Sequence, residues 1–169
     1  AESTKQAVYF AKAAHDAGCN AIMAIPPIST ALPVTALQDY FNTLAEAVPV
    51  PLIVQDASSY VGASIPTTFY VHLLDQYGPQ KILFKPEGAP IGPNISDLRN
   101  ASSGRACMFD GSGGMLLIDA FRRGVVGTMP GMDLLDGIAA LWQALQNKDD
   151  QTAYRIYFPI CAIVALQLQ

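Results

Sequence analysis

Apolar and polar positions alternate along the chain in two patterns, one typical of buried strands and one typical of helices. Short apolar runs bounded by Gly and Pro predict strands, and longer segments with a helical pattern lie between them. The runs that predict strands are Ala21–Ile25, Pro51–Val54, Ile82–Phe84, Ala106–Phe109 and Val125–Met129. The segments that predict helices are residues 2–17, 34–47, a stretch opened by Pro66, 94–102, 114–122, 133–146 and a last one from about residue 149.

Strands that alternate with helices indicate parallel pairing through right-handed crossovers, so we expect an α/β protein of about five βα units. Two architectures fit this order of elements. One is an open doubly wound sheet of the flavodoxin type, and the other is a (β/α)8 barrel without its first three units. A flavodoxin-like module would need a phosphate-binding first loop, which this sequence does not show.

Composition narrows the class of partner. The chain has 169 residues, of which 51% are hydrophobic and 14% charged, with a net charge of −4. Phosphate backbones and anionic membranes require clustered Lys and Arg, and Arg122-Arg123 is too short a cluster, so we expect neither partner. No apolar run approaches the roughly 20 residues that span a bilayer.

The cysteines and the first residues bear on cellular context. Cys19, Cys107 and Cys161 are widely spaced and odd in number. This pattern predicts neither a metal site nor a disulfide framework, and it is typical of free thiols in a reducing compartment, so we expect a cytoplasmic protein. The chain begins Ala-Glu-Ser-Thr without Met, which suggests a trimmed or partial sequence.

Polar or conformationally special residues follow the predicted strands. They are Gln55, Lys85 with Glu87, Gly111 and Gly127-Thr128. Because the carboxyl ends of parallel strands meet at one rim, these residues predict a pocket for a small molecule. Asp110-Gly-Ser-Gly-Gly lacks the Lys and the spacing of a nucleotide-binding loop, so a tight turn is the better interpretation.

Lys85 carries the most specific chemistry of this set. Strand alternation places Leu83, Lys85 and Glu87 on one side, and an interior position there would favour a neutral amine that can attack a keto group. The alternative is a lysine at an exposed strand end. Glu87 could relay protons or bind a substrate hydroxyl, or it could be a solvated carboxylate in a loop. Gln55 could recognise a substrate hydroxyl, or it could make a structural hydrogen bond to a neighbouring strand.

The segment from Phe84 to Ile95 resembles the lysine strand of the dihydrodipicolinate synthase/N-acetylneuraminate lyase family. It combines Lys85, Glu87 and Pro90-Ile-Gly-Pro, a combination most similar to members that handle 2-keto-3-deoxy sugar acids. Three further stretches agree in order and spacing. They are Ala24–Pro27, Val50–Asp56 and Arg123–Gly131. The resemblance spans about residues 5 to 169.

This resemblance implies strands 4–8 of a parallel (β/α)8 TIM barrel, with residues 1–131 in the barrel. Residues 132–169 would form its last helix and the start of a C-terminal helical extension. It also implies a class I aldolase or dehydratase in which Lys85 forms a Schiff base with a 2-keto acid. Gln55, Glu87, Gly111, Gly127 and Thr128 would bind the substrate. No metal or organic cofactor is needed, and a homotetramer is expected.

Two departures from the family pattern limit the expected activity. Members carry three upstream βα units, including a loop that binds the substrate carboxylate, so we expect this chain to be the C-terminal part of a longer protein. Members usually carry a Tyr after the prolines of the fourth strand, where this chain has Ile28. We therefore hypothesise that Tyr60 partly replaces that phenol. The alternative is a catalytically impaired relative that binds a small acid or serves as an assembly partner.

Overall fold

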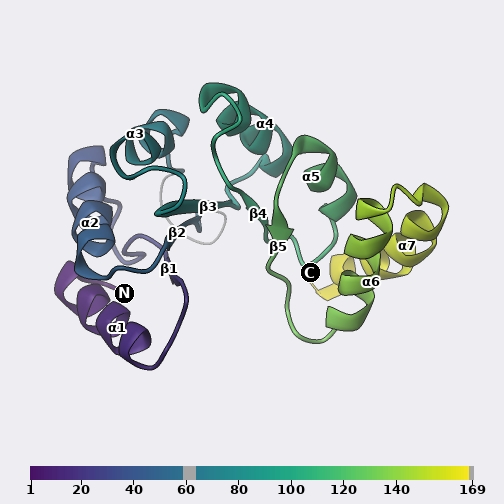
Figure 1. Ribbon diagram of the computed structural model, residues 1–169, viewed down its shortest axis with the longest axis horizontal. Helices are drawn as coiled ribbons and strands as arrows, with labels where there is room; N and C mark the ends of the chain where they lie inside the picture. The colour runs from purple at the N-terminus through teal and green to yellow at the C-terminus, as the bar shows by residue number, and fades with distance from the viewer. Residues whose placement is uncertain (59–63, 168–169) are drawn as a thin grey trace. The chain divides into compact units, whose positions relative to one another are not determined.

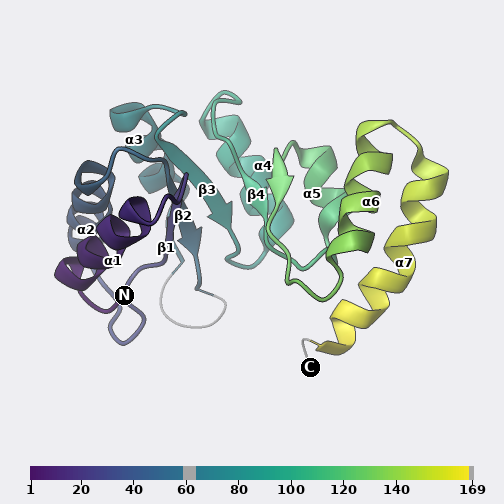
Figure 2. The same cartoon turned by 60° about the horizontal axis from the view of Figure 1, so that its bottom comes forward.

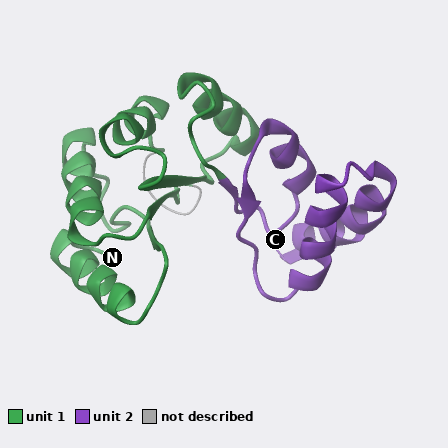
Figure 3. Cartoon of the chain, viewed as in Figure 1, with its two compact units in different colours: residues 1–108 green, residues 109–169 purple. Residues whose placement is uncertain are grey.

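The computed structural model describes residues 1–58 and 64–167, and it divides into two compact units (Figures 1 and 3). Unit 1 comprises residues 1–108 and unit 2 comprises residues 109–169. The sequence predicts another boundary, between residues 131 and 132, where the barrel would end and a helical extension would begin. That boundary differs from the division into units, and it stays a prediction.

In residues 1–58 and 64–108, unit 1 alternates four helices with three parallel strands. In chain order these are α1 (Thr4–Asp16), β1 (Ile22–Ala24), α2 (Val34–Ala47), β2 (Leu52–Asp56), α3 (Thr67–Tyr77), β3 (Ile82–Pro86) and α4 (Ile91–Ala101). The strands pair in the order β1-β2-β3, and Met108 adds one parallel bridge to Phe84. The order of helices and strands agrees with the apolar pattern, and the predicted α/β class with parallel strands is confirmed (Figure 2).

The core of unit 1 lies between the sheet and its helices. Leu52, Val54, Ile82 and Phe84 are fully buried, and they occupy alternate positions of β2 and β3. Phe84 meets Tyr70 of α3 edge to face, with ring centroids 5.2 Å apart. Because strand side chains alternate between faces, this helix-facing set turns Gln55 and Lys85 to the other face of the sheet.

Helix α4 begins three residues earlier than the apolar pattern predicted, at Ile91 rather than residue 94. Pro90 stands at its N-cap, and Pro93 falls within its first turn. A proline is tolerated there because the first N–H groups of a helix have no intrahelical acceptor. The proline-rich segment after Lys85 therefore belongs partly to a helix.

Unit 2, as far as residue 167, consists of a two-stranded parallel sheet and three helices. In chain order these are β4 (Phe109–Asp110), α5 (Leu117–Arg123), β5 (Gly127–Thr128), α6 (Leu135–Gln146) and α7 (Asp150–Gln167). Leu117, Leu141 and Ala153 are fully buried in its core. The helix predicted at residues 114–122 begins later, because Ser112 Oγ accepts a hydrogen bond from Leu116 N in the turn before it. None of the helices in the described ranges is long and apolar enough to cross a membrane.

Candidate active site around Lys85

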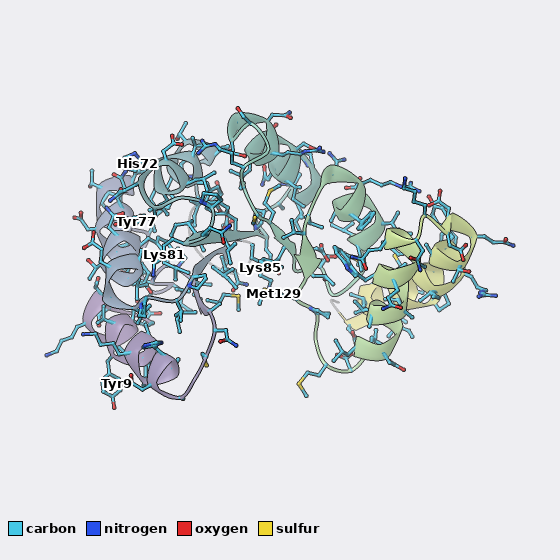
Figure 4. All side chains as sticks on the ribbon, in the orientation of Figure 1. Tyr9, His72, Tyr77, Lys81, Lys85 and Met129 are labelled. Carbon is cyan, nitrogen blue, oxygen red and sulfur yellow. The ribbon has the colours of Figure 1, made fainter. Side chains whose placement is uncertain are left out.

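Lys85 is the last residue but one of β3, and only 7% of its surface is exposed. Leu83 and Lys85 share the face of the sheet opposite to Ile82 and Phe84, as alternation predicted. Figure 4 shows Lys85 and Lys81 on the segment that carries β3. The sequence left open whether Lys85 is buried or exposed, and the structure places it among the buried residues.

Glu87 is the ionic partner of Lys85. Its Oε2 atom lies 3.2 Å from Lys85 Nζ, and the two side chains are 10% and 9% exposed. The carboxylate reaches back because the chain turns directly after the strand, where Glu87 N donates to Lys85 O at 3.1 Å. A solvated loop carboxylate is therefore the wrong interpretation of Glu87.

Gln55 joins the same carboxylate from the neighbouring strand. It is the register partner of Lys85 across β2 and β3, and its Nε2 donates to Glu87 Oε2. One carboxylate oxygen thus meets both the amine of Lys85 and the amide of Gln55. Of the two alternatives for Gln55, the structure shows a structural hydrogen bond, although its acceptor, Glu87, directly follows the neighbouring strand rather than lying in it.

Asp56 follows Gln55 but faces the helices. It is 3% exposed, and its carboxylate accepts hydrogen bonds from Ser58 N at 2.8 Å and from Ile65 N at 3.2 Å. Burial, and next the charge of Asp56, raise the pKa of Tyr70 far above its ordinary value. Asp56 therefore binds the backbone at Ser58 and Ile65, whereas Gln55 contacts Glu87 on the face that carries Lys85.

Two hollows open near these strand ends. One of about 250 Å³ is lined by Pro26, Pro27, Asp56 and Ser58, among others, and lies on the Asp56 side. Another of about 460 Å³ is lined by residues that include Phe10, Tyr40 and Gln55. Gln55, Lys85 and Glu87 form one cluster, which we call the Lys85 cluster. Through Gln55 this cluster reaches the larger hollow. Lys85 itself does not line either hollow.

Ile28 stands where a phenol was expected, and it is 45% exposed. Its loop is tied to the start of the chain, because Glu2 accepts hydrogen bonds from Ile28 N at 3.3 Å and from Ser29 N at 3.1 Å. These bonds, the Ser29 hydroxyl foremost, lower the pKa of Glu2. Tyr60, the predicted substitute for the phenol, lies outside the described residues, so its role stays a prediction.

The remaining predicted site residues belong to unit 2. Thr128 Oγ1 lies 3.2 Å from Asp110 Oδ2 and also 3.2 Å from the Asp110 carbonyl oxygen. A Cβ on Gly127 would lie 2.9 Å from the ring of Phe109, so close packing by itself requires glycine there. These contacts give Gly127 and Thr128 structural roles inside unit 2. Substrate binding by Gly111, Gly127 and Thr128 stays a prediction.

No group of three or more His, Cys, Asp or Glu side chains in residues 1–58 and 64–167 could hold a metal ion. What the Lys85 cluster offers is an amine with a carboxylate beside it. An amine can act as a nucleophile toward a carbonyl, and a carboxylate can exchange protons with it.

Comparison with known proteins finds one family and one curated relative that are similar in sequence. The model of the dihydrodipicolinate synthetase family matches residues 1–78. A 4-hydroxy-tetrahydrodipicolinate synthase from Methanosarcina mazei is 26% identical over 165 residues, which cover 96% of this chain and 55% of the relative. Over residues 1–78 the chain is thus similar to the dihydrodipicolinate synthetase family. It spans just over half the length of the curated relative that it matches.

Solved structures with the family fold match nearly the whole chain. A dihydrodipicolinate synthase from Acinetobacter baumannii, complexed with pyruvate, has a TM-score of 0.84 at 21% identity over 99% of this chain and 57% of its own. A sialic acid aldolase from Ruminococcus gnavus, solved as a catalytic-lysine mutant, has a TM-score of 0.86 at 20% identity. That match covers 98% of this chain and 54% of the aldolase. The predicted fold, part of a parallel (β/α)8 barrel, is confirmed.

Proposed function

We propose that the protein is a Schiff-base-forming lyase, an aldolase or dehydratase, that acts on a 2-keto acid such as a 2-keto-3-deoxy sugar acid. The observation that carries this proposal is the buried amine of Lys85 at the carboxyl end of β3, with a carboxylate 3.2 Å from it. The family contains aldolases and synthases. Pyruvate, the smallest 2-keto acid, is bound by the related synthase from Acinetobacter baumannii.

The reaction follows from the chemistry of a neutral amine. Lys85 Nζ attacks C2 of the keto acid, the carbonyl oxygen leaves as water, and a protonated imine remains on the lysine. In an aldol cleavage that iminium accepts the electron pair of the broken C–C bond, and in a dehydration it accepts the pair of a C3–H bond; either way an enamine forms. The enamine then takes up a proton, or in the dehydration expels the neighbouring hydroxyl, and the iminium that results is hydrolysed to free the lysine. No other electron sink is required by this sequence of steps.

Borohydride trapping tests the proposal. The intact protein is incubated with pyruvate and borohydride, and its mass is measured. We expect a stable adduct of one reduced pyruvate in the wild type and none in Lys85→Arg, because a guanidinium keeps its charge and forms no imine. Lys81→Arg is the matched control and should trap as the wild type does. A wild-type protein that never traps pyruvate would exclude the lyase function.

A catalytically impaired relative is the second candidate, and Ile28 is the observation that favours it. An aliphatic side chain cannot transfer the proton that the phenol of other members carries. This candidate predicts that the protein binds a small acid without forming an adduct. Isothermal titration with pyruvate, run beside the trapping experiment, separates it from the lyase.

We also propose a homotetramer in the cytoplasm, on the basis of resemblance to family members and of the free cysteines. Light scattering of the intact protein after size-exclusion chromatography measures the assembly. A monomer at micromolar concentration would contradict the tetramer and would leave the chemistry of Lys85 unaffected.

A further inference from the structure

The cluster of Lys85, Glu87 and Gln55 assigns a proton carrier to the proposed reaction. Glu87 Oε2 lies 3.2 Å from Lys85 Nζ, and the same oxygen accepts a hydrogen bond from Gln55 Nε2. We infer that Glu87 is a catalytic residue that carries the proton during imine formation. We infer further that Gln55 is a positioning residue that holds the carboxylate in place. This inference rests on the proposed function.

Imine formation needs a base at this point of the molecule. A charged ammonium has no electron pair with which to attack a carbonyl, so one proton must first leave Lys85 Nζ. Because the side chain is 9% exposed, bulk water has little access to that proton. In the described part of the chain, the ion pair that Lys85 makes is the one with Glu87.

The proton can be followed through the step without a co-reactant. Glu87 takes one proton from the Lys85 ammonium and becomes a neutral carboxylic acid. The neutral amine adds to C2 of the keto acid, and a proton shift within the adduct gives a carbinolamine. The acid then returns its proton to the carbinolamine hydroxyl, which leaves as water. One keto acid and one ammonium become one iminium and one water, and Glu87 is again a carboxylate.

A carboxylate on the neighbouring strand shows why Glu87 is suited to this role. Asp56 is also buried, but both of its oxygens accept hydrogen bonds from backbone N–H groups, of Ser58 and Ile65. Those bonds engage Asp56 with the backbone of Ser58 and Ile65. Glu87 instead meets an amide and an ammonium, and the ammonium can release a proton to it. Ile28, at the expected position of the phenol, has no proton to exchange.

The test measures how fast the intact protein forms its borohydride-trapped pyruvate adduct. General acid–base catalysis contributes about 100-fold or more, so Glu87→Gln should slow adduct formation by about that factor. Glu87→Ala should be equally slow, and added formate should restore part of its rate by replacing the lost carboxylate. Lys85→Arg in formate is the control that must stay inactive. Circular dichroism confirms that each variant is folded.

The outcomes are distinguishable. Absence of an adduct in the wild type would overturn the proposed function itself. An adduct that forms equally fast in wild type and Glu87→Gln would leave that function standing and overturn the role of Glu87. A folded Glu87→Ala that formate does not accelerate would also overturn it, since a purely structural loss is not restored by a free acid. Should Glu87→Gln fail to fold, Glu87→Ala carries the test, and a wild-type rate there without formate counts against the inference.

Gln55 is tested with the same substrate. Gln55→Leu removes one hydrogen bond to a charged oxygen and should slow adduct formation roughly tenfold with pyruvate itself. The pyruvate concentration that gives half the maximal rate should stay nearly constant. Pyruvate has no hydroxyl beyond its acid and keto groups. An effect confined to hydroxylated keto acids would therefore show that Gln55 binds substrate and would overturn its positioning role.

Discussion

One lysine directly precedes strand β3 and another lies near its carboxyl end (Figure 4). The two lysines differ in the groups that surround their amines. Lys81, before the strand, donates to the carbonyl oxygens of Val48 and Val50, the latter at 2.7 Å. Desolvation lowers its pKa. Lys85, at the other end, faces the carboxylate of Glu87 at 3.2 Å.

The difference teaches that desolvation alone does not make a reactive lysine. Lys85 is buried and Lys81 is partly buried. A backbone carbonyl oxygen accepts a hydrogen bond but does not take up a proton at neutral pH. Lys81 is held by acceptors of that kind and closes the connection after α2. Lys85 has a partner that can take its proton, so chemistry is expected at that end of the strand.

The largest effect is expected from breaking the buried ion pair. Lys85→Met leaves the Glu87 carboxylate buried without its cation and should lower the free energy of unfolding by about 3 kcal/mol. Adding Glu87→Gln should recover much of that loss, because the uncompensated charge is gone. Urea denaturation of the two single variants and the double variant measures the coupling. Losses that simply add would show that the two side chains do not form a buried pair in solution.

Close packing behind the carboxyl end of β3 gives the next effect. A Cβ on Gly88 would lie 2.6 Å from Asp56 Oδ2 and 2.9 Å from Ser58 Oγ. Gly88→Ala should therefore cost about 2 kcal/mol by overpacking. Ala89→Ser, at the exposed next residue, should change stability by less than about 0.5 kcal/mol. Thermal unfolding compares the two, and equal stabilities would mean that Gly88 and Asp56 are not in contact.

At the other end of the strand, Lys81→Met should have a smaller cost. It deprives two carbonyl groups of a partly exposed donor, which should lower the free energy of unfolding by about 1 kcal/mol. The rate of pyruvate trapping should stay at the wild-type value. A strong loss of trapping in folded Lys81→Met would contradict the division of roles between the two lysines.

The smallest effect on stability is expected at alkaline pH and comes from Tyr77, the last residue of α3. Burial, and next the hydrogen bond and charge of Glu46, raise the pKa of Tyr77 to about 12. A pKa raised by folding means that the neutral phenol stabilises the fold below about pH 10, the value for an unfolded chain. That contribution is lost as the pH rises through about 12. Tyr77→Phe should lose less stability over this window in urea denaturation, and identical pH profiles would refute it.

Much of the fold could be predicted because burial imposes a pattern on the sequence. Helix α2 occupies residues 34–47 as predicted, and β1 lies within the predicted run Ala21–Ile25. Elements whose limits depend on turns were harder to predict. The start of α5 is set by a hydrogen bond to Ser112 Oγ, and that of α4 by Pro90, and neither alters the apolar period.

For the candidate site, the sequence predicts the face on which a residue of one strand lies, but not the contacts between strands. Alternation along β3 was enough to place Lys85 on the face opposite to Phe84. The contact between Gln55 and Glu87 depends on the register of β2 against β3, which pairs Gln55 with Lys85. Nothing in the linear order of apolar residues specifies that register. For the same reason, Gln55 and Glu87 were assigned to the substrate rather than to each other.

The position of the trapped pyruvate tests the account most directly. After borohydride reduction of the intact protein, tandem mass spectrometry of the peptides can tell a modified Lys85 from a modified Lys81. The account predicts that the adduct lies on Lys85 while Lys81 stays unmodified in the same sample. An adduct on Lys81, or one shared evenly among surface lysines, would contradict the claim that a neighbouring carboxylate makes one end of β3 reactive.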